Sequence, residues 1–276
     1  MNGSGRFQAA LTTMRCFSLF LYTVMKNHFV VLVVTLLLVA GGQAQDPASL
    51  LEEGRKLELK LKDEDALEKY RQVLVIQPSN LKAIMRSAEV SCALASRKGS
   101  PEEKLVGYLQ AKRFAEAGLR LDSNSAEANY TMAVVLGKLT EVERRNDEVV
   151  QYVKQVKSYI DKSLKLDPGF GKAWHVLGKW HLEVVMLNGI KKAALKIIYG
   201  GVGEATLAKA IECMEKCKTM EPYYTRNFFD LARAYEFGKQ YEKSIKLLEQ
   251  LAKLPTKRQD DVVVKAEGAV MLQKLQ

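Results

Sequence analysis

Apolar residues recur along most of the chain at the three- and four-residue spacing that places them on one face of an α-helix. Two successive series between residues 126 and 170 are Tyr130, Met132, Ala133, Leu136 and Leu139, then Val153, Val156, Ile160, Ser163 and Leu164. No stretch of useful length alternates between apolar and polar residues, as a half-buried strand does. The pattern predicts an all-α chain whose helices come in pairs.

The helix pairs repeat, and Pro78, Pro168 and Pro222 each end one copy. The copy before Pro78 contains Gly54-x2-Leu57 and then Ala66-x3-Tyr70, while the copy before Pro222 contains Trp174-x2-Leu177-Gly178-x2-His181 and then Ala210-x3-Met214. These spacings are those of the tetratricopeptide repeat, a helix–turn–helix unit of about 34 residues. Because one unit cannot bury its apolar face alone, such units stack into a curved solenoid with an extended concave surface.

About five copies cover the chain without gaps: residues 47–80, 81–125, 126–170, 171–224 and 225–258. The first and last copies have the usual length, and we expect the extra residues of the middle three at the turn between paired helices. The position where helices must approach closely holds a small residue in every copy: Gly54, Ala88, Ala133, Gly178 and Ala232.

A last helix is expected after the fifth copy, with Asp260 as its N-cap. Its predicted apolar face consists of Val263, Ala266, Val270 and Met271. Such a helix would cap the open end of the solenoid, since terminal units of a repeat array need a polar outer face.

Residues 1–44 do not follow the repeat pattern. Met25-Lys26-Asn27-His28 is a short positive start, Phe29 to Val39 is an apolar run, and Gly42-Gln43-Ala44 places small residues before Gln45. This order is typical of a cleaved secretory signal peptide. We therefore predict an exported protein, periplasmic or secreted.

This interpretation divides the chain into an upstream extension at 1–24, a signal peptide at 25–44 and a repeat domain at 45–276. The alternative is an uncleaved membrane anchor from Phe17 to Val39, which would leave the repeats membrane-anchored or cytoplasmic. It would place Lys26 inside the bilayer, where a central Lys costs about 2.5–3.5 kcal/mol.

Composition adds a weak preference for acidic partners. The chain has a formal net charge of +10 at pH 7, and residues 1–44 contain three basic residues and no acidic one. A basic protein attracts acidic surfaces in general. There is no run of five or more Lys or Arg, so a nucleic-acid partner is not predicted.

Few residues suggest catalysis, metal binding or a cofactor. His175 and His181 are six residues apart on one helix and so point to different faces, unlike a metal-binding pair. Gly200-Gly201-Val202-Gly203 lacks the Lys-Ser/Thr of a phosphate-binding loop and is interpreted as a turn. Cys213 and Cys217, one helical turn apart, are interpreted as small buried residues, although a disulfide between them stays open. The sequence predicts a non-catalytic protein.

The candidate site is a basic groove on the concave side, formed by the first helices of copies four and five. The residues expected to face inward are Lys172, His175, Lys179, Arg226, Phe229 and Arg233. Four cations and an aromatic ring on adjacent helices suit an acidic peptide or a C-terminal carboxylate. The alternative is that Glu183 and Glu236 neutralise these cations in ordinary local ion pairs.

The stretch from Trp174 to Pro255 resembles the regulator of microtubule dynamics family. The resemblance rests on Leu-Gly-Lys-Trp at 177–180, on the basic insert from Lys191 to Gly200, on Glu221-Pro222 and on Asn-Phe-Phe-Asp-Leu-Ala at 227–232. It implies a tetratricopeptide solenoid without catalysis and, as in some animal members, association with microtubules or a tethering role. With a signal peptide, the chain would be an exported or bacterial relative that keeps the scaffold.

Overall fold

The structure is a computed structural model that describes residues 46–187, 189 and 200–276. The predicted extension at 1–24, the signal peptide at 25–44 and the alternative anchor lie outside these residues, as does most of the basic insert. Residues from Pro47 to Gln276 form one compact unit. Among the described helices, none combines the length and apolar character needed to cross a bilayer.

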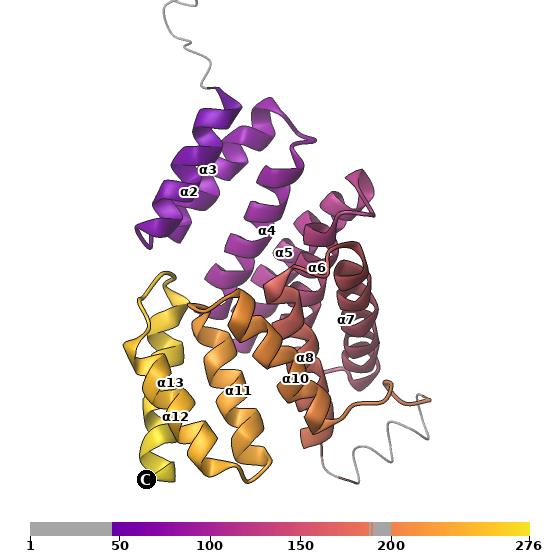
Figure 1. The fold of residues 1–276 in the computed structure, drawn as a ribbon. Helices are drawn as coiled ribbons and strands as arrows, with labels where there is room; N and C mark the ends of the chain where they lie inside the picture. Colours follow the sequence, from indigo (N-terminus) through magenta and orange to yellow (C-terminus); the bar gives the residue numbers. More distant parts are fainter. Residues whose placement is uncertain (1–45, 188, 190–199) are drawn as a thin grey trace, which may run out of the picture. The chain divides into compact units, whose positions relative to one another are not determined.

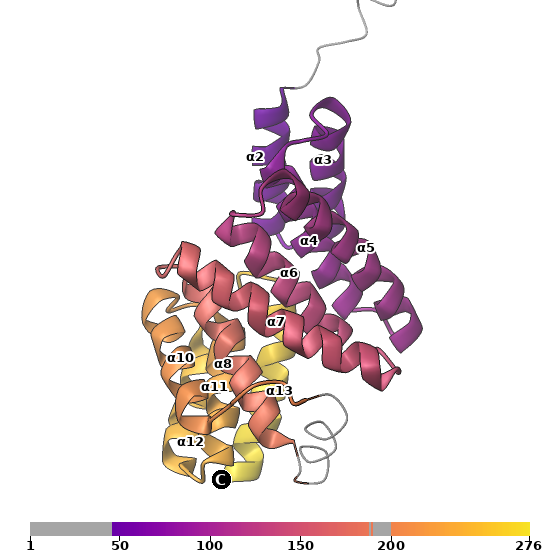
Figure 2. The ribbon, with the colours of Figure 1, turned by 90° about the vertical axis from the view of Figure 1, so that its right-hand side faces the viewer.

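The described residues form helices joined by turns, without a strand among them. The helices are α2 (Pro47–Leu59), α3 (Asp63–Ile76), α4 (Leu81–Ser96), α5 (Pro101–Leu121), α6 (Ala126–Leu139), α7 (Asn146–Leu166), α8 (Gly171–Met186), α10 (Leu207–Met220), α11 (Thr225–Phe237), α12 (Tyr241–Lys253) and α13 (Asp260–Leu275). Consecutive helices pack as hairpins: α2 with α3, α4 with α5, α6 with α7, α8 with α10, and α11 with α12 (Figures 1 and 2). The predicted all-α solenoid of five hairpins with a last helix is confirmed.

Close approach within the hairpins occurs where small residues were predicted. A Cβ atom on Gly54 would lie 2.5 Å from the Tyr70 ring, and one on Gly178 would lie 2.7 Å from Met214 Cγ and 2.9 Å from the carbonyl oxygen of Ala210. The equivalent Ala88, Ala133 and Ala232 are fully buried. A larger side chain at these positions would force the paired helices apart.

The extra residues of copies two and three do not lengthen the turns, so that prediction is wrong. Instead, the second helices are extended: α5 and α7 have 21 residues each, compared with 14 in α3 and 13 in α12. Because these residues continue the apolar spacing of the helix, adding helical turns buries more surface than a loop would. In copy four the extra residues do separate the paired helices, between α8 and α10.

The buried face of α13 also differs from the prediction. Val264 and Gly268 are buried, whereas Val263 and Val270 are about half exposed, at 51% and 54%. Gly268 sets this orientation because a Cβ atom there would lie 2.6 Å from Leu251 of α12. Asp260 is the first helical residue rather than the N-cap, a position that Gln259 occupies.

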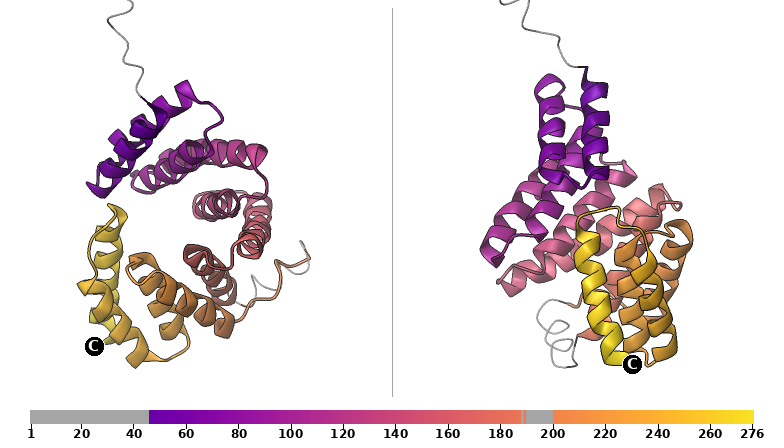
Figure 3. Two further views of the ribbon diagram at one scale, coloured as in Figure 1. Left: turned by 45° about the horizontal axis from the view of Figure 1, so that its top comes forward. Right: turned by 90° about the vertical axis from the view of Figure 1, so that its left-hand side faces the viewer.

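Within this unit, the first hairpin meets the start of α13 (Figure 3). Arg97 follows α4 and binds Asp63 at 2.8 Å and Asp260 at 2.7 Å. The side chain of Gln259 donates a hydrogen bond to the carbonyl oxygen of Leu61. We call these five residues the end junction, because they join the first and last elements of the unit through polar side chains.

Candidate functional site

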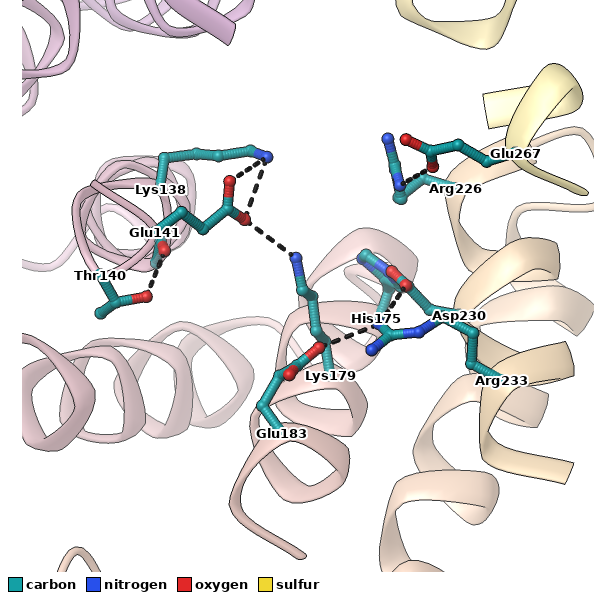
Figure 4. A network of polar contacts seen from close by, with 11 residues as sticks. Lys138, Thr140, Glu141, His175, Lys179, Glu183, Arg226, Asp230, Arg233 and Glu267 are labelled. Atoms are coloured by element: carbon teal, nitrogen blue, oxygen red, sulfur yellow. Dashed lines mark hydrogen bonds and ion pairs between the residues drawn. The ribbon is translucent and has the colours of Figure 1, made fainter. Parts of the chain in front are cut away.

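The first helices of copies four and five place their polar residues at helical spacing. On α8, His175, Lys179 and Glu183 follow one another at intervals of four, so they lie along one side of the helix. On α11, Arg226 and Asp230 are also four apart. Figure 4 shows His175 and Asp230 in contact between the two helices, while Lys179 extends toward Glu141 and Arg226 toward Glu267.

Asp230 is the residue that ties α8 to α11. It is 1% exposed, and its carboxylate contacts His175 Nε2 at 2.9 Å and Arg233 at 3.2 Å. Burial by itself would raise the pKa of Asp230, but the hydrogen bond to His175 and the charge of Lys179 hold it far below its usual range. The carboxylate is therefore ionised and can only accept hydrogen bonds.

His175 is neutral in this arrangement. It is 3% exposed, and burial lowers its pKa despite the hydrogen bond with Asp230. Because an ionised carboxylate only accepts, the His175 proton must sit on Nε2 and be donated to Asp230. His175 thus positions the two helices and offers little surface to a ligand.

Three of the four predicted groove cations are paired with carboxylates (Figure 4). Lys179 contacts Glu141 at 3.4 Å, Arg226 contacts Glu267 at 3.2 Å, and Arg233 contacts Glu183 at 2.9 Å. Glu183 neutralises Arg233 as the alternative interpretation expects, but the partner of Arg226 is Glu267 of α13 and not Glu236. These three cations therefore carry little net attraction for an acidic segment.

A cavity of ≈750 Å³ lies beside this network, between α6, α7 and α8. Its apolar wall contains Val134, Val149, Val153, Val156, Val176, Val184 and Trp180. Lys179, Glu183 and Arg226 of the ion-paired network line the same cavity. Cavities of about 300–1,000 Å³ with apolar walls and a few fixed polar groups are typical ligand sites.

The structure places the six predicted groove residues in different surroundings. His175, Lys179 and Arg226 line the large cavity, whereas Lys172 lines a second cavity near the end junction. Phe229 packs against the core of the last hairpins, with the Arg226 guanidinium 5.7 Å from its ring centre.

The sequence-based prediction of the site missed Asp230, Glu141 and Glu267. Asp230 could have been found, because it lies three residues after Asn227 and four before Ala234, both on the buried face of α11. A carboxylate on a buried face needs a charged or hydrogen-bonding partner. Glu141 and Glu267 reach the site from other elements, and their local sequence carries no such signal.

The remaining candidates for chemistry are structural. Cys92, Cys213 and Cys217 are buried free thiols, and burial raises the pKa of Cys213 to about 11 and of Cys217 to about 12. His181 packs at 7% exposure, with burial lowering its pKa. Gly200, Gly201 and Gly203 all have positive φ, as expected of a turn. Among the described residues, no group of three or more His, Cys, Asp or Glu could hold a metal.

Residues 50–276 match the family described as "Regulator of microtubule dynamics protein 1-3". The chain belongs to this family. It is 26% identical over 143 residues to regulator of microtubule dynamics protein 3 of Xenopus laevis, a match that covers 52% of the chain and 30% of the frog protein. It is 20% identical over 183 residues to regulator of microtubule dynamics protein 1 of Caenorhabditis elegans, covering 66% of the chain and 80% of the worm protein.

A solved structure supports the fold assignment of this family member. A thermophilic tetratricopeptide repeat protein of Thermus thermophilus matches with a TM-score of 0.61 at 12% identity, covering 82% of the chain and all of that protein. At this identity the likeness concerns the fold alone. The chain matches only about a third of the frog relative's length, so its binding properties need their own argument.

Proposed function

We propose that the protein is a non-catalytic scaffold of the tetratricopeptide type, which holds a peptide segment of a partner protein in its concave groove. The observation that carries this proposal is the ≈750 Å³ valine-lined cavity bordered by Lys179, Glu183 and Arg226. An apolar side chain of the partner that fills such a cavity contributes about 1.5–3 kcal/mol.

The polar border gives the segment its orientation. An acidic side chain of the partner would displace Glu141 from Lys179, or Glu183 from Arg233. Since each exchange replaces one ion pair by another, it fixes the register of the segment more than it adds affinity. The main affinity comes from the apolar anchor.

The test introduces a charge into the cavity. Val149→Asp places a carboxylate in the first turn of α7, where a negative charge is compatible with the helix dipole. Val106→Asp is the matched control, because Val106 lies near the start of α5 and is 69% exposed. The measurement is a selection of short displayed random peptides for binding to the full chain. Wild type and Val106→Asp should enrich peptides that share an apolar residue, and Val149→Asp should not. Equal enrichment by all three chains would place the binding face elsewhere.

A second candidate function is a microtubule-associated or organelle-tethering adaptor, since the matching relatives are named as regulators of microtubule dynamics. This role requires the repeats in the cytosol. Co-sedimentation of the full chain with microtubules tests it, and loss of co-sedimentation in Val149→Asp but not in Val106→Asp would assign the interaction to the same cavity. Export stays a prediction. If it holds, N-terminal sequencing of the native protein should find a mature chain that begins near Gln45. A membrane role would instead need an uncleaved N-terminal segment.

A further inference from the structure

A second cavity of ≈320 Å³ lies where the first hairpin meets the end of the fifth copy. It is lined by Arg86 and Glu89 of α4, Lys172 of α8, and Tyr224 and Arg258. Tyr224 also lines the large cavity, and its ring contacts that of His175 edge-on, with the ring centres 5.1 Å apart. The two cavities therefore share a wall, and one extended segment can reach both.

Lys172 differs from the other cations of the predicted groove. Within the described part of the chain it forms no ion pair, and neither Glu89 nor Glu221, which line the same cavity, lies within ion-pair distance of its ammonium. Glu89 is instead bound by Arg86, which also binds Glu58. Lys172 is thus a half-buried positive charge without a direct partner.

Arg258 adds a second cation that is only weakly held. Its guanidinium lies 3.9 Å from Glu89, at the outer limit of an ion pair. Burial lowers the pKa of Lys172, and the charge of Arg258 lowers it further. A carboxylate of a partner that reached both side chains would give Lys172 the direct partner that it lacks and would add a charge-assisted hydrogen bond from Arg258.

We propose that this smaller cavity is a carboxylate subsite, in which Lys172 and Arg258 hold an Asp or Glu side chain of the same segment whose apolar residue fills the large cavity. This inference rests on the proposed function. It assigns recognition of the acidic residue of the partner to Lys172, because Lys179 and Arg233 are already ion-paired. It also assigns the order of the segment, with an acidic residue at a fixed separation from an apolar anchor.

The test uses peptides selected against the full chain from a displayed random library. Each selected peptide is synthesised with an amidated C-terminus and again with its acidic residue changed to Gln. On wild type, removing the carboxylate should weaken binding about tenfold or more. On Lys172→Gln, the same change should weaken binding several-fold less than on wild type, because one of the two cations that hold the carboxylate is gone.

The controls separate this inference from the proposed function. Lys253→Gln removes an exposed lysine of α12 and should keep the full penalty for losing the carboxylate. An unchanged penalty on Lys172→Gln overturns the subsite even if the apolar anchor still binds. A neutral peptide whose only carboxylate is its C-terminus, binding as well as the acidic peptide, would also overturn the side-chain assignment. A library without enriched peptides overturns the proposed function, and the subsite with it.

Discussion

The packing within the hairpins and the end junction hold the same unit together by different interactions. Between α8 and α10 the contact is close and apolar, with Gly178 against Met214 and no room for a Cβ atom. At the end junction the contact is polar and partly solvated: the side chain of Arg97 is 23% exposed and that of Asp260 is 38% exposed. Buried packing is insensitive to salt, whereas partly exposed ion pairs weaken as salt screens them. The two regions should therefore respond differently to the same solution conditions.

The largest effect is expected at Asp230, which combines both kinds of interaction. Asp230→Ala removes the acceptor for His175 and Arg233 from a buried contact between α8 and α11. A hydrogen bond to a charged group contributes about 1.5–3 kcal/mol, and the substitution removes two such bonds and leaves the buried His175 N–H without its acceptor. Urea unfolding of the full chain measures this, and Asp230→Asn, which keeps an acceptor for His175, should cost clearly less. Equal stability of Asp230→Ala and wild type would contradict the role assigned to this carboxylate.

Gly178 tests the apolar side of the comparison. In Gly178→Ala the new Cβ atom meets the backbone oxygen of Ala210, and the strain should lower stability by about 1–3 kcal/mol. Gly137→Ala is the matched control, because a Cβ atom there has open space and alanine favours the helix by about 0.5–1 kcal/mol. The two substitutions should shift the urea midpoint in opposite directions at any salt concentration. A shift of the same sign in both would reject the predicted close approach at Gly178.

Arg97→Ala tests the polar side. Loss of two partly exposed ion pairs should lower stability by about 1 kcal/mol at low salt, and this difference from wild type should shrink as salt is added. Hydrogen exchange at the start of α13 should become faster. Arg55→Ala is the control, since the ion pair of Arg55 with Glu52 lies on an exposed face of a single helix. An effect that does not depend on salt would show that Arg97 acts by packing.

The smallest effect is expected on the outer face of α13. Val263→Lys changes a half-exposed side chain and should alter the unfolding free energy by less than about 0.5 kcal/mol. The adjacent Val264 is 1% exposed, so Val264→Lys should destabilise the unit severely. A comparable loss in both variants would favour the face of α13 that the sequence pattern predicts.

The fold could be predicted from the sequence wherever local spacing determines it. Helical periodicity and the small residues at Gly54 and Gly178 identify the hairpins, because each hairpin is specified by residues close together in the chain. The face of α13 could not be predicted in this way, since Val262, Val263 and Val264 are consecutive and periodicity allows more than one choice. Gly268 decides between these faces through its contact with Leu251, which no local pattern reveals.

The candidate site was predicted only in part for the same reason. The spacing of His175 and Lys179 on α8 and of Arg226 on α11 is visible in the sequence. The carboxylates that contact these residues come from other elements of the fold; the contact of His175 with Asp230 spans 55 positions. A sequence pattern therefore identifies cations on one side of a helix but does not tell which of them lacks a partner.

The end junction also has a consequence for how the chain folds. A repeat array can fold from any of its units because each unit contacts only its neighbours. The contact of Arg97 with Asp260, however, joins residues 163 positions apart. Direct closure of so long a loop in an unfolded chain is entropically unfavourable, so the intervening hairpins must first bring the two ends together. During synthesis, the end junction can form only after residues 259 and 260 have emerged, whereas the first hairpin is made of residues that emerge much earlier.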